Sequence, residues 1–257
     1  MIIKILVATH KKYWMLQDSV YLPVQLGSAI NKTLGYQRDD EGENISAKQP
    51  YYAELTAMYW AWKNLKADYI GINHYRRYFS KEKYHFFGEA DKNKLFNYKD
   101  FEILLKKYPV ILPKQRNYFI ETRYAQYKHA HNIADLKLCR EIIKKLYPEY
   151  LNAFDSTINK TKGHILNMFV MRYDLYCKYC QWLFSILFKL EQEINLKNYI
   201  GYQQRVLGYI AERLLDVWIE HNHIQYIDAD YVTLEKINWT NKIKNFLKRK
   251  FDRSINI

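Results

Sequence analysis

Two short apolar runs, separated by a helical pattern, constrain the fold of this chain more than any other feature. The first run, residues 2–8, is rich in β-branched side chains, and the second covers residues 68–73. Between them, apolar side chains recur at helical spacing over residues 51–65. Strand, helix and strand in this order predict a parallel or mixed sheet with helices on its faces.

Further apolar patterns continue through the chain and become more helical in the second half. Short strands are predicted at residues 110–112 and 165–171, and helices at 134–147, 174–194 and 206–219. The segment 37–50 has the most loop-like composition. We expect it to interrupt a domain rather than separate two, since no repeat or low-complexity tract marks a boundary. The predicted fold class is α/β, with a helix-rich C-terminal half.

The C-terminal tail differs from the rest of the chain. As a helix, the segment from residue 240 would gather Ile243, Phe246, Leu247 and Phe251 on one side, with lysine and arginine around the rest. Such a basic amphipathic helix is typical of proteins that lie on anionic lipid, although a plain solvated helix has the same composition. We therefore expect one domain over residues 1–235 and a basic tail over residues 236–257.

The charge balance limits the classes of partner. Lys and Arg number 40 against 27 Asp and Glu, a formal net charge of +13. That excess suits nucleic acid, anionic lipid or a nucleotide-sugar diphosphate. We expect no nucleic-acid partner, because the chain carries no recognisable nucleic-acid-binding motif. The first apolar run ends too early for a signal peptide, and the 3 Cys fit a reducing compartment, so a cytoplasmic protein is predicted.

Several common sites are disfavoured by their missing motifs. With 8 Gly in total, the chain has neither a dinucleotide-binding nor a P-loop glycine pattern, and no serine-hydrolase elbow. Cys177-x-x-Cys180 lies in a helical pattern, which favours core packing over zinc. His129-x-His131 and His221-x-His223 are spaced too closely to share a helix face, so we expect them at the surface or behind the site.

Basic side chains follow both predicted N-terminal strands. Thr9-His10-Lys11 comes directly after the first strand, and His74-Tyr75-Arg76-Arg77 after the second. Ligands of open α/β sheets bind beyond the carboxyl ends of the strands, and arginine donates paired hydrogen bonds to phosphate oxygens. These two segments predict an anion site. The alternative is that the arginines are solvated and His74 is a core residue.

Two glutamates are candidates for a catalytic base. Glu54 lies in the first predicted helix, and Glu212 lies in the last one, directly before Arg213. Apolar neighbours would bury either carboxylate and raise its proton affinity. For Glu212, an ordinary surface pair with Arg213 is the alternative.

A series of segments resembles a known bacterial family. The segments are Asn44-Ile45-Ser46, residues 52–64 (Tyr-Ala-Glu-Leu-Thr-Ala-Met-Tyr-Trp-Ala-Trp-Lys-Asn) and residues 68–79 (Asp-Tyr-Ile-Gly-Ile-Asn-His-Tyr-Arg-Arg-Tyr-Phe). They resemble the capsular and exopolysaccharide biosynthesis family long labelled as a domain of unknown function, whose members are linked to glycosyl transfer, notably of galactofuranose. The sequence departs from the family pattern at Ala53, where a Cys is expected, and at Gln49, where an Asn is expected.

The resemblance implies a GT-A-like, Rossmann-related fold and a nucleotide-sugar site. It implies donor contacts from the first strand end (Thr9, His10, Lys11), from the polar loop (Asp39, Asp40, Asn44) and from Arg76 and Arg77. The Asp-x-Asp pair that holds Mn²⁺ or Mg²⁺ in many such folds is missing after the second strand. Either Asp39, Asp40 or Glu54 supplies carboxylates to a metal, or Lys11, Arg76 and Arg77 neutralise the diphosphate alone. We expect no metal ligands.

The resemblance thus implies a glycosyltransferase that uses a UDP-sugar, with galactofuranose as the expected sugar. Glu212 is the expected base, with His74 or Glu54 as substitutes. The expected acceptor is a lipid-linked saccharide at the inner face of the plasma membrane, to which the tail would bind. The alternative is a non-catalytic module that binds a nucleotide-sugar or carbohydrate in the same pathway.

Overall fold

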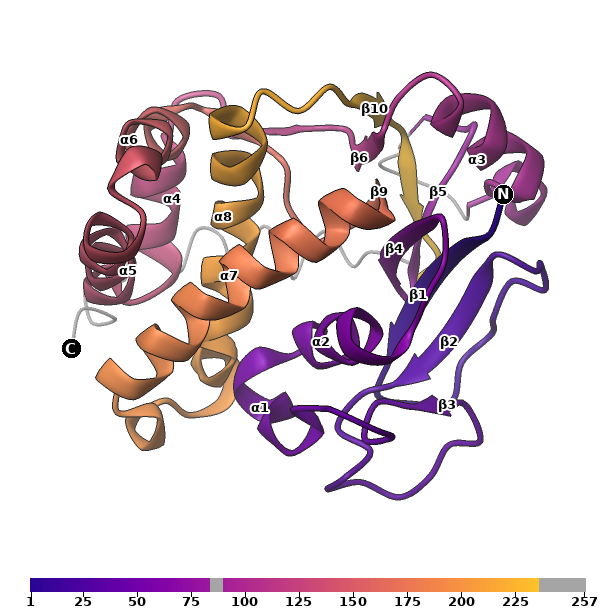
Figure 1. Ribbon diagram of the computed structural model, residues 1–257, viewed down its shortest axis with the longest axis horizontal. Coiled ribbons are helices and arrows are strands. Elements are labelled where there is room, and N and C mark those ends of the chain that lie inside the picture. Colours follow the sequence, from indigo (N-terminus) through magenta and orange to yellow (C-terminus); the bar gives the residue numbers. More distant parts are fainter. Residues whose placement is uncertain (84–89, 236–257) are drawn as a thin grey trace.

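The computed structural model describes residues 1–83 and 90–235. The predicted basic tail, residues 236–257, therefore lies outside the described residues. In the described part, a mixed β-sheet is flanked by helices, which confirms the predicted α/β class. Helices α4, α5, α6 and α8 gather on one side, the strands near the N-terminus on the other, and α7 runs between them (Figure 1).

The centre of the sheet consists of parallel strands from the first part of the chain. Neighbouring strands in the sheet follow the order β10-β6-β9-β4-β1-β2-β3. Their bounds are β1 Ile3–Thr9, β2 Tyr21–Gln25, β3 Gln37–Arg38, β4 Tyr69–His74, β6 Val110–Pro113, β9 Phe169–Arg172 and β10 Ile227–Ala229. Strands β1 to β4 pair in parallel, whereas β9 runs antiparallel to both β4 and β6.

Shorter strands extend the sheet near its polar edge. Strand β5 (Arg77–Phe79) folds back on β4 and pairs with β11 (Tyr231–Thr233). A separate ladder joins β7 (Arg116–Asn117) to β8 (Lys162–Gly163). These pairings bring the segment that ends at Glu235 next to the residues that follow β4.

The helices cover both faces of the sheet. Their bounds are α1 Gln49–Tyr52, α2 Leu55–Asn64, α3 Tyr98–Leu105, α4 Arg123–Ala130, α5 Ile133–Leu146, α6 Leu151–Asn159, α7 Tyr173–Glu193 and α8 Val206–His221. Among residues 1–83 and 90–235, no helix combines the length and the apolar character that crossing a bilayer requires.

Strand β1 is buried on both faces, as predicted for a central strand. Leu6 and Ala8 belong to the hydrophobic cluster under α2, α7 and α8, whereas Ile5 and Val7 belong to the cluster under α3. Successive side chains of a strand point to opposite faces, so a continuous apolar run supplies both cores.

Two predicted elements are wrong in detail, and both differences concern the left-handed backbone region. The helix expected over 51–65 is divided into α1 and α2, because Ala53 has φ 51°. The strand expected over 165–171 begins only at Phe169, because Leu166 and Asn167 have φ 83° and 48°. Positive φ is unfavourable for residues other than glycine, and it concentrates at functional sites.

A group of charged side chains, buried except for Asp228, joins three elements behind the sheet edge. His164 follows β8, and its ring nitrogens contact Asp216 of α8 and Asp228 of β10. Arg123 of α4 lies 2.6 Å from the Asp216 carboxylate. We call these four residues the His164 cluster. The imidazole lies between two carboxylates, and although burial opposes protonation, their hydrogen bonds and charges raise the pKa of His164 to about 9.

Candidate active site

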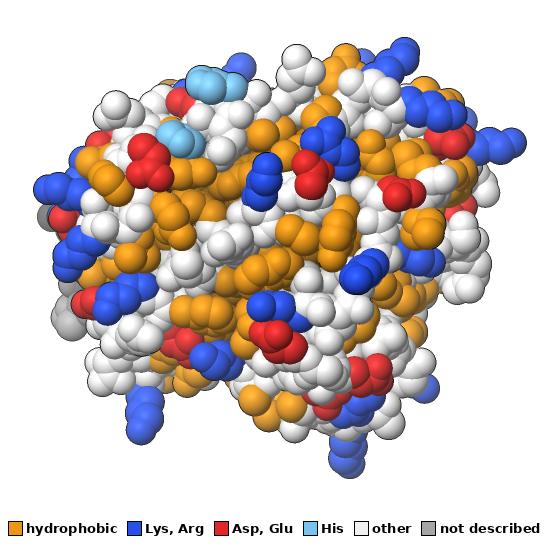
Figure 2. Space-filling model, in the orientation of Figure 1, with side chains coloured by type: hydrophobic (Ala, Val, Ile, Leu, Met, Phe, Trp, Pro, Cys, Tyr) orange, Lys and Arg blue, Asp and Glu red, His pale blue; other side chains and the backbone are white. Residues whose placement is uncertain are grey.

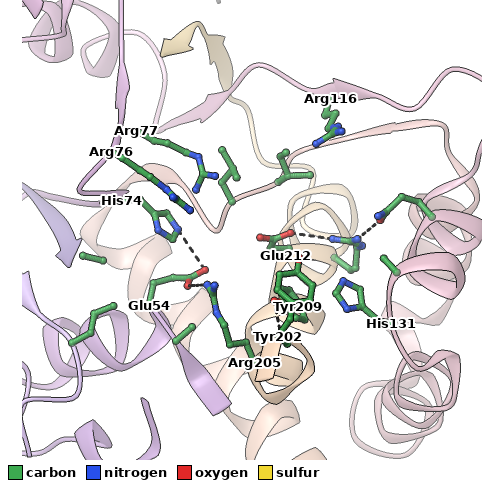
Figure 3. A pocket seen from close by; sticks show the side chains of 18 of the residues that line it. Glu54, His74, Arg76, Arg77, Arg116, His131, Tyr202, Arg205, Tyr209 and Glu212 are labelled. Carbon is green, nitrogen blue, oxygen red and sulfur yellow. Dashed lines mark hydrogen bonds and ion pairs between the residues drawn. The ribbon is translucent and has the colours of Figure 1, made fainter. Parts of the chain in front are cut away.

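A pocket of about 570 Å³ opens beyond the carboxyl ends of β1 and β4 (Figure 3). Its walls come from those strand ends, the junction of α1 and α2, the segment from β7 to the end of α4, and the first turns of α8. The polar lining residues are His10, Gln49, Glu54, His74, Tyr75, Arg76, Arg77, Arg116, Tyr118, Glu121, Gln126, His129, His131, Tyr202, Arg205, Tyr209, Glu212 and Arg213.

The two basic segments meet because β1 and β4 are parallel neighbours. Ala8 pairs with His74 in the ladder, so the segments that follow both strands leave the sheet at the same edge. His10, His74, Arg76 and Arg77 all line the pocket. Parallel pairing thus brings together side chains more than sixty positions apart in the sequence.

Two other residues of the first strand end lie outside the pocket lining. The hydroxyl of the buried Thr9 donates to the carbonyl of Lys11 at 2.6 Å, which shapes the turn after β1. The Lys11 ammonium lies 3.3 Å from Glu235. Arg76 contacts the other oxygen of Glu235 at 2.8 Å, so one carboxylate joins the cations of both strand ends.

Glu54 occupies the break between α1 and α2, where its buried carboxylate meets several donors. Asn167 donates to it at 2.7 Å, and the Arg205 guanidinium lies 3.4 Å away. The Nε2 atom of His74 lies 3.7 Å from Glu54 (Figure 3). Burial alone would raise the pKa of Glu54, but His74, Arg205 and Asn167 together lower it to about 2. Glu54 is therefore ionised at neutral pH and is a weak base.

Glu212 has the opposite electrostatic setting. It faces the pocket from α8, and its carboxylate lies 3.2 Å from the buried Arg213. Burial raises the pKa of Glu212 above its ordinary value, and Arg213 only partly offsets this. Arg213 also donates to Gln126 of α4. Arg213 is buried and the Glu212 side chain is 21% exposed, so the two do not form an ordinary exposed surface pair.

Arg77 differs from the other cations of the pocket. Within residues 1–83 and 90–235, no hydrogen bond or ion pair engages its guanidinium, which points into the pocket (Figure 3). Burial and the neighbouring Arg76 lower the pKa of Arg77. A partly buried guanidinium without an acidic partner is unfavourable unless an anion binds it.

Aromatic rings form the opposite wall. His131 stacks on Tyr209 with ring centroids 4.1 Å apart, and on Tyr202 at 5.9 Å. Gln203 holds the edge of the His131 ring through a 3.0 Å contact between its Oε1 atom and His131 Nδ1. These rings were not predicted to form a wall, because His131 was expected at the surface or behind the site and no spacing links it to Tyr202 or Tyr209.

The polar-loop candidates do not line the pocket. The Asp39 carboxylate is buried and accepts hydrogen bonds from Gly27 and Ser28 at 2.9 Å each and from Thr56 at 2.6 Å. Asp40 pairs with Arg38, and Asn44 donates to the carbonyls of Asp40 and Gly42. In this arrangement these side chains hold the loop 37–50 against β2 and α2.

The carboxylates near the strand ends do not fit a divalent cation. Such an ion needs several free oxygen ligands. The oxygens of Asp39 are hydrogen-bonded, Asp40 is paired with arginine, and Glu54 is surrounded by cations. In the described ranges, no group of His, Cys, Asp or Glu is arranged to hold a metal ion.

Comparison with known proteins identifies relatives of the chain. Residues 4–223 match a family described as a domain of unknown function, DUF4422. Among solved structures, the chain is similar to the apo form of WbbM, described as a bifunctional glycosyltransferase, with 32% identity and a TM-score of 0.84. The similarity covers 92% of this chain and 46% of WbbM, so the chain spans about half of that protein. No curated protein matches. The fold is GT-A-like.

Proposed function

We propose that this chain, which belongs to the DUF4422 family, transfers a sugar from a nucleotide-diphospho-sugar to a saccharide acceptor. The observation that carries the proposal is the pocket at the strand ends. There, arginine side chains that are not all paired with carboxylates line a space of about 570 Å³. Glu212, whose pKa is raised, lines the same space. A space of this size accommodates a ligand of nucleotide-sugar dimensions.

The strand-end side of the pocket suits the donor diphosphate. Arg77 lacks a described partner, and Arg76 and Arg205 line the same space. When the sugar leaves, negative charge develops on the diphosphate oxygen, and fixed cations stabilise that charge. The carboxylates of the site do not fit a divalent ion, so we assign this neutralisation to the arginines. Burial and the neighbouring cations lower the pKa of His10, which disfavours a positive charge on its ring.

Glu212 is better suited to accept the acceptor's proton than Glu54. Its raised pKa makes it a stronger base, whereas Glu54 is committed to His74, Arg205 and Asn167. We assign Glu54 and His74 to positioning Arg205 at the donor side. With Glu212 as base, activity should decline as pH falls through its raised pKa.

The aromatic wall suits the acceptor. The Tyr202 ring is largely exposed and is backed by His131 and Tyr209, which fix its orientation. Sugar rings present apolar C–H faces that stack on such aromatic surfaces. This wall lies across the pocket from Arg77 and His74, with Glu212 between them (Figure 3). A base between donor and acceptor is the arrangement that sugar transfer to a hydroxyl requires.

The finer assignment rests on the family resemblance. We propose UDP-galactofuranose as the donor and a lipid-linked polysaccharide intermediate as the acceptor, at the inner face of the plasma membrane. WbbM is bifunctional and the chain spans 46% of it, so we assign a single transfer reaction to the described domain.

The test is an assay of sugar transfer by the purified protein with a panel of UDP-sugars that includes UDP-galactofuranose. The release of UDP measures the transfer. We expect turnover with one donor and its loss in Glu212→Gln. Glu141→Gln, which removes an exposed carboxylate outside the pocket, is the matched control. UDP-sugar binding without any turnover would favour the non-catalytic module instead. Absence of both binding and turnover would refute the proposal.

A further inference from the structure

Two surface segments beside the pocket expose large apolar side chains. Phe119 and Ile120 are 79% and 85% exposed, and they lie between two pocket-lining residues, Tyr118 and Glu121. Ile200 is 80% exposed and stands two positions before Tyr202, which also lines the pocket. We call residues 117–121 and 200–202 the apolar rim. These are among the most exposed large apolar side chains of the described chain.

The first rim segment is an ordered turn. The Asn117 side chain accepts from the Phe119 amide at 2.8 Å, and the Tyr118 carbonyl accepts from the Ile120 amide at 2.8 Å. Phe119 has φ 60°, a left-handed conformation that L side chains rarely adopt. The turn thus holds two apolar side chains in solvent with a backbone conformation that is unfavourable for Phe, which points to a partner for them.

Helix α4 connects the two rim segments along one side of the pocket. Residues 117–121 directly precede its cap, Thr122, which accepts from the Ala125 amide. At its other end, Gln203 donates to the Ala130 carbonyl at 2.9 Å, which fixes the 200–202 segment there. An eight-residue helix is about 12 Å long. The rim therefore has two apolar contact points at opposite ends of a pocket wall.

The charges near the rim are mainly positive. Arg116 and Lys162 are exposed on the β7–β8 ladder that adjoins the turn, where Asn117 pairs with Lys162. Lys128 on α4 and Lys197 before Ile200 are also exposed. None of these four cations has an acidic partner among the described residues. The acidic group of the turn, Glu121, lies 3.3 Å from His129.

We propose that the apolar rim contacts an anionic phospholipid surface and turns the mouth of the pocket toward it. Separate apolar side chains among cations fit the boundary between lipid headgroups and acyl chains, whereas a protein partner would favour one continuous apolar face. The proposal rests on the proposed function only for its purpose, delivery of a lipid-linked acceptor. The membrane contact is made by described residues and does not require residues 236–257.

The first experiment measures insertion directly. Ile120→Cys in the full chain is labelled with an environment-sensitive dye and mixed with vesicles of equal parts phosphatidylglycerol and phosphatidylcholine. We expect dye emission to rise and shift to the blue. Ile103→Cys is the matched control, because Ile103 is the same residue type and is 59% exposed, but lies on α3, across the sheet. Unsubstituted protein gives the background from Cys177. Vesicle binding without a signal at position 120, or no vesicle binding at all, would overturn the proposal.

The second experiment separates this proposal from the proposed function. Phe119→Ser/Ile120→Ser should weaken partition into the same vesicles by at least about tenfold, while Ile103→Ser should not. Transfer to a water-soluble acceptor should be unchanged, since neither side chain lines the pocket. A protein that inserts but never transfers sugar would refute only the proposed function. Unaltered vesicle binding, with loss of self-association in light scattering, would instead assign the rim to a second copy of the chain.

Discussion

Two groups of charged side chains in this molecule have the same chemistry and different surroundings. In the pocket, His74, Glu54 and Arg205 place an imidazole and a guanidinium around a buried carboxylate. In the His164 cluster, His164 and Arg123 surround Asp216 in the same way. Each group joins the sheet edge to the helices beside it.

The two groups differ in how many of their charged and hydrogen-bonding atoms have partners. His164 and Arg123 are each 1% exposed, and both nitrogens of the His164 ring have carboxylate partners. In the pocket, His74 stands 3.7 Å from Glu54, and Arg77 beside it has no described partner. A buried group whose charges are paired with one another stabilises the fold, whereas a guanidinium without an ion-pair partner can bind a ligand.

The largest expected effect comes from removing a carboxylate of the His164 cluster. Asp216→Asn removes the carboxylate that compensates His164 and Arg123 while keeping its shape. The free energy of unfolding should fall by about 3–5 kcal/mol, since a buried charge is left unpaired. Urea denaturation measures it. Asp155→Asn breaks a more exposed pair with Arg140 and should cost less than about 1 kcal/mol. Equal losses in the two variants would contradict the comparison.

The next effect concerns Arg77, the pocket guanidinium without a described partner. Arg77→Ala should lower kcat/KM for sugar transfer by about 10²–10³, because the charge that develops on the leaving diphosphate loses a donor. Its stability should stay close to that of the parent protein, as no described partner is left behind. Arg140→Ala, far from the pocket, is the control for activity. Transfer at the parent rate would remove Arg77 from the donor site.

The His164 cluster should also make the stability of the fold depend on pH. The pKa of His164 rises from 6.5 to about 9 on folding, so its contribution is complete below pH 6.5 and is lost as pH rises through 9. The loss should reach roughly 3 kcal/mol, an order-of-magnitude value. Urea denaturation between pH 6 and 10 measures it, with His164→Gln as reference. The free energies of unfolding of the two proteins should converge at high pH. If they instead differ by the same amount at every pH, His164 stays neutral in the folded protein.

The smallest expected effect on stability concerns β4, the strand that ends at the pocket. Gly71 of β4 lies so close to β9 that an added Cβ would stand 2.7 Å from the Phe169 carbonyl. Gly71→Ala should therefore cost about 1–3 kcal/mol through displacement of β9. Gly208→Ala in α8 is the control, because its Cβ would meet Ala53 at an ordinary 3.6 Å. Thermal unfolding compares the two, and equal melting temperatures would argue against the tight β4–β9 contact.

Much of the fold followed from local patterns. The strands at β1 and β4 and the helices α5, α7 and α8 were predicted within about a residue or two, because each has a long, regular apolar period. Strand β2 was missed: its residues Tyr21–Gln25 contain Pro23 and have no clear alternation. The break at Ala53 was also missed, since helical spacing continues across it and only contacts with α8 and with Asn167, which precedes β9, reveal it.

The α/β class and the basic strand ends follow from the order of residues alone, because apolar period and residue type are local properties. The sequence also singled out Glu54 and Glu212, but could not distinguish them. Three properties depend on the folded chain: His74 and Arg205 lower the pKa of Glu54, burial raises the pKa of Glu212, and Asp39 is enclosed in a loop. Proton affinity and access to a ligand depend on burial and on partners distant in the chain, which no local pattern records.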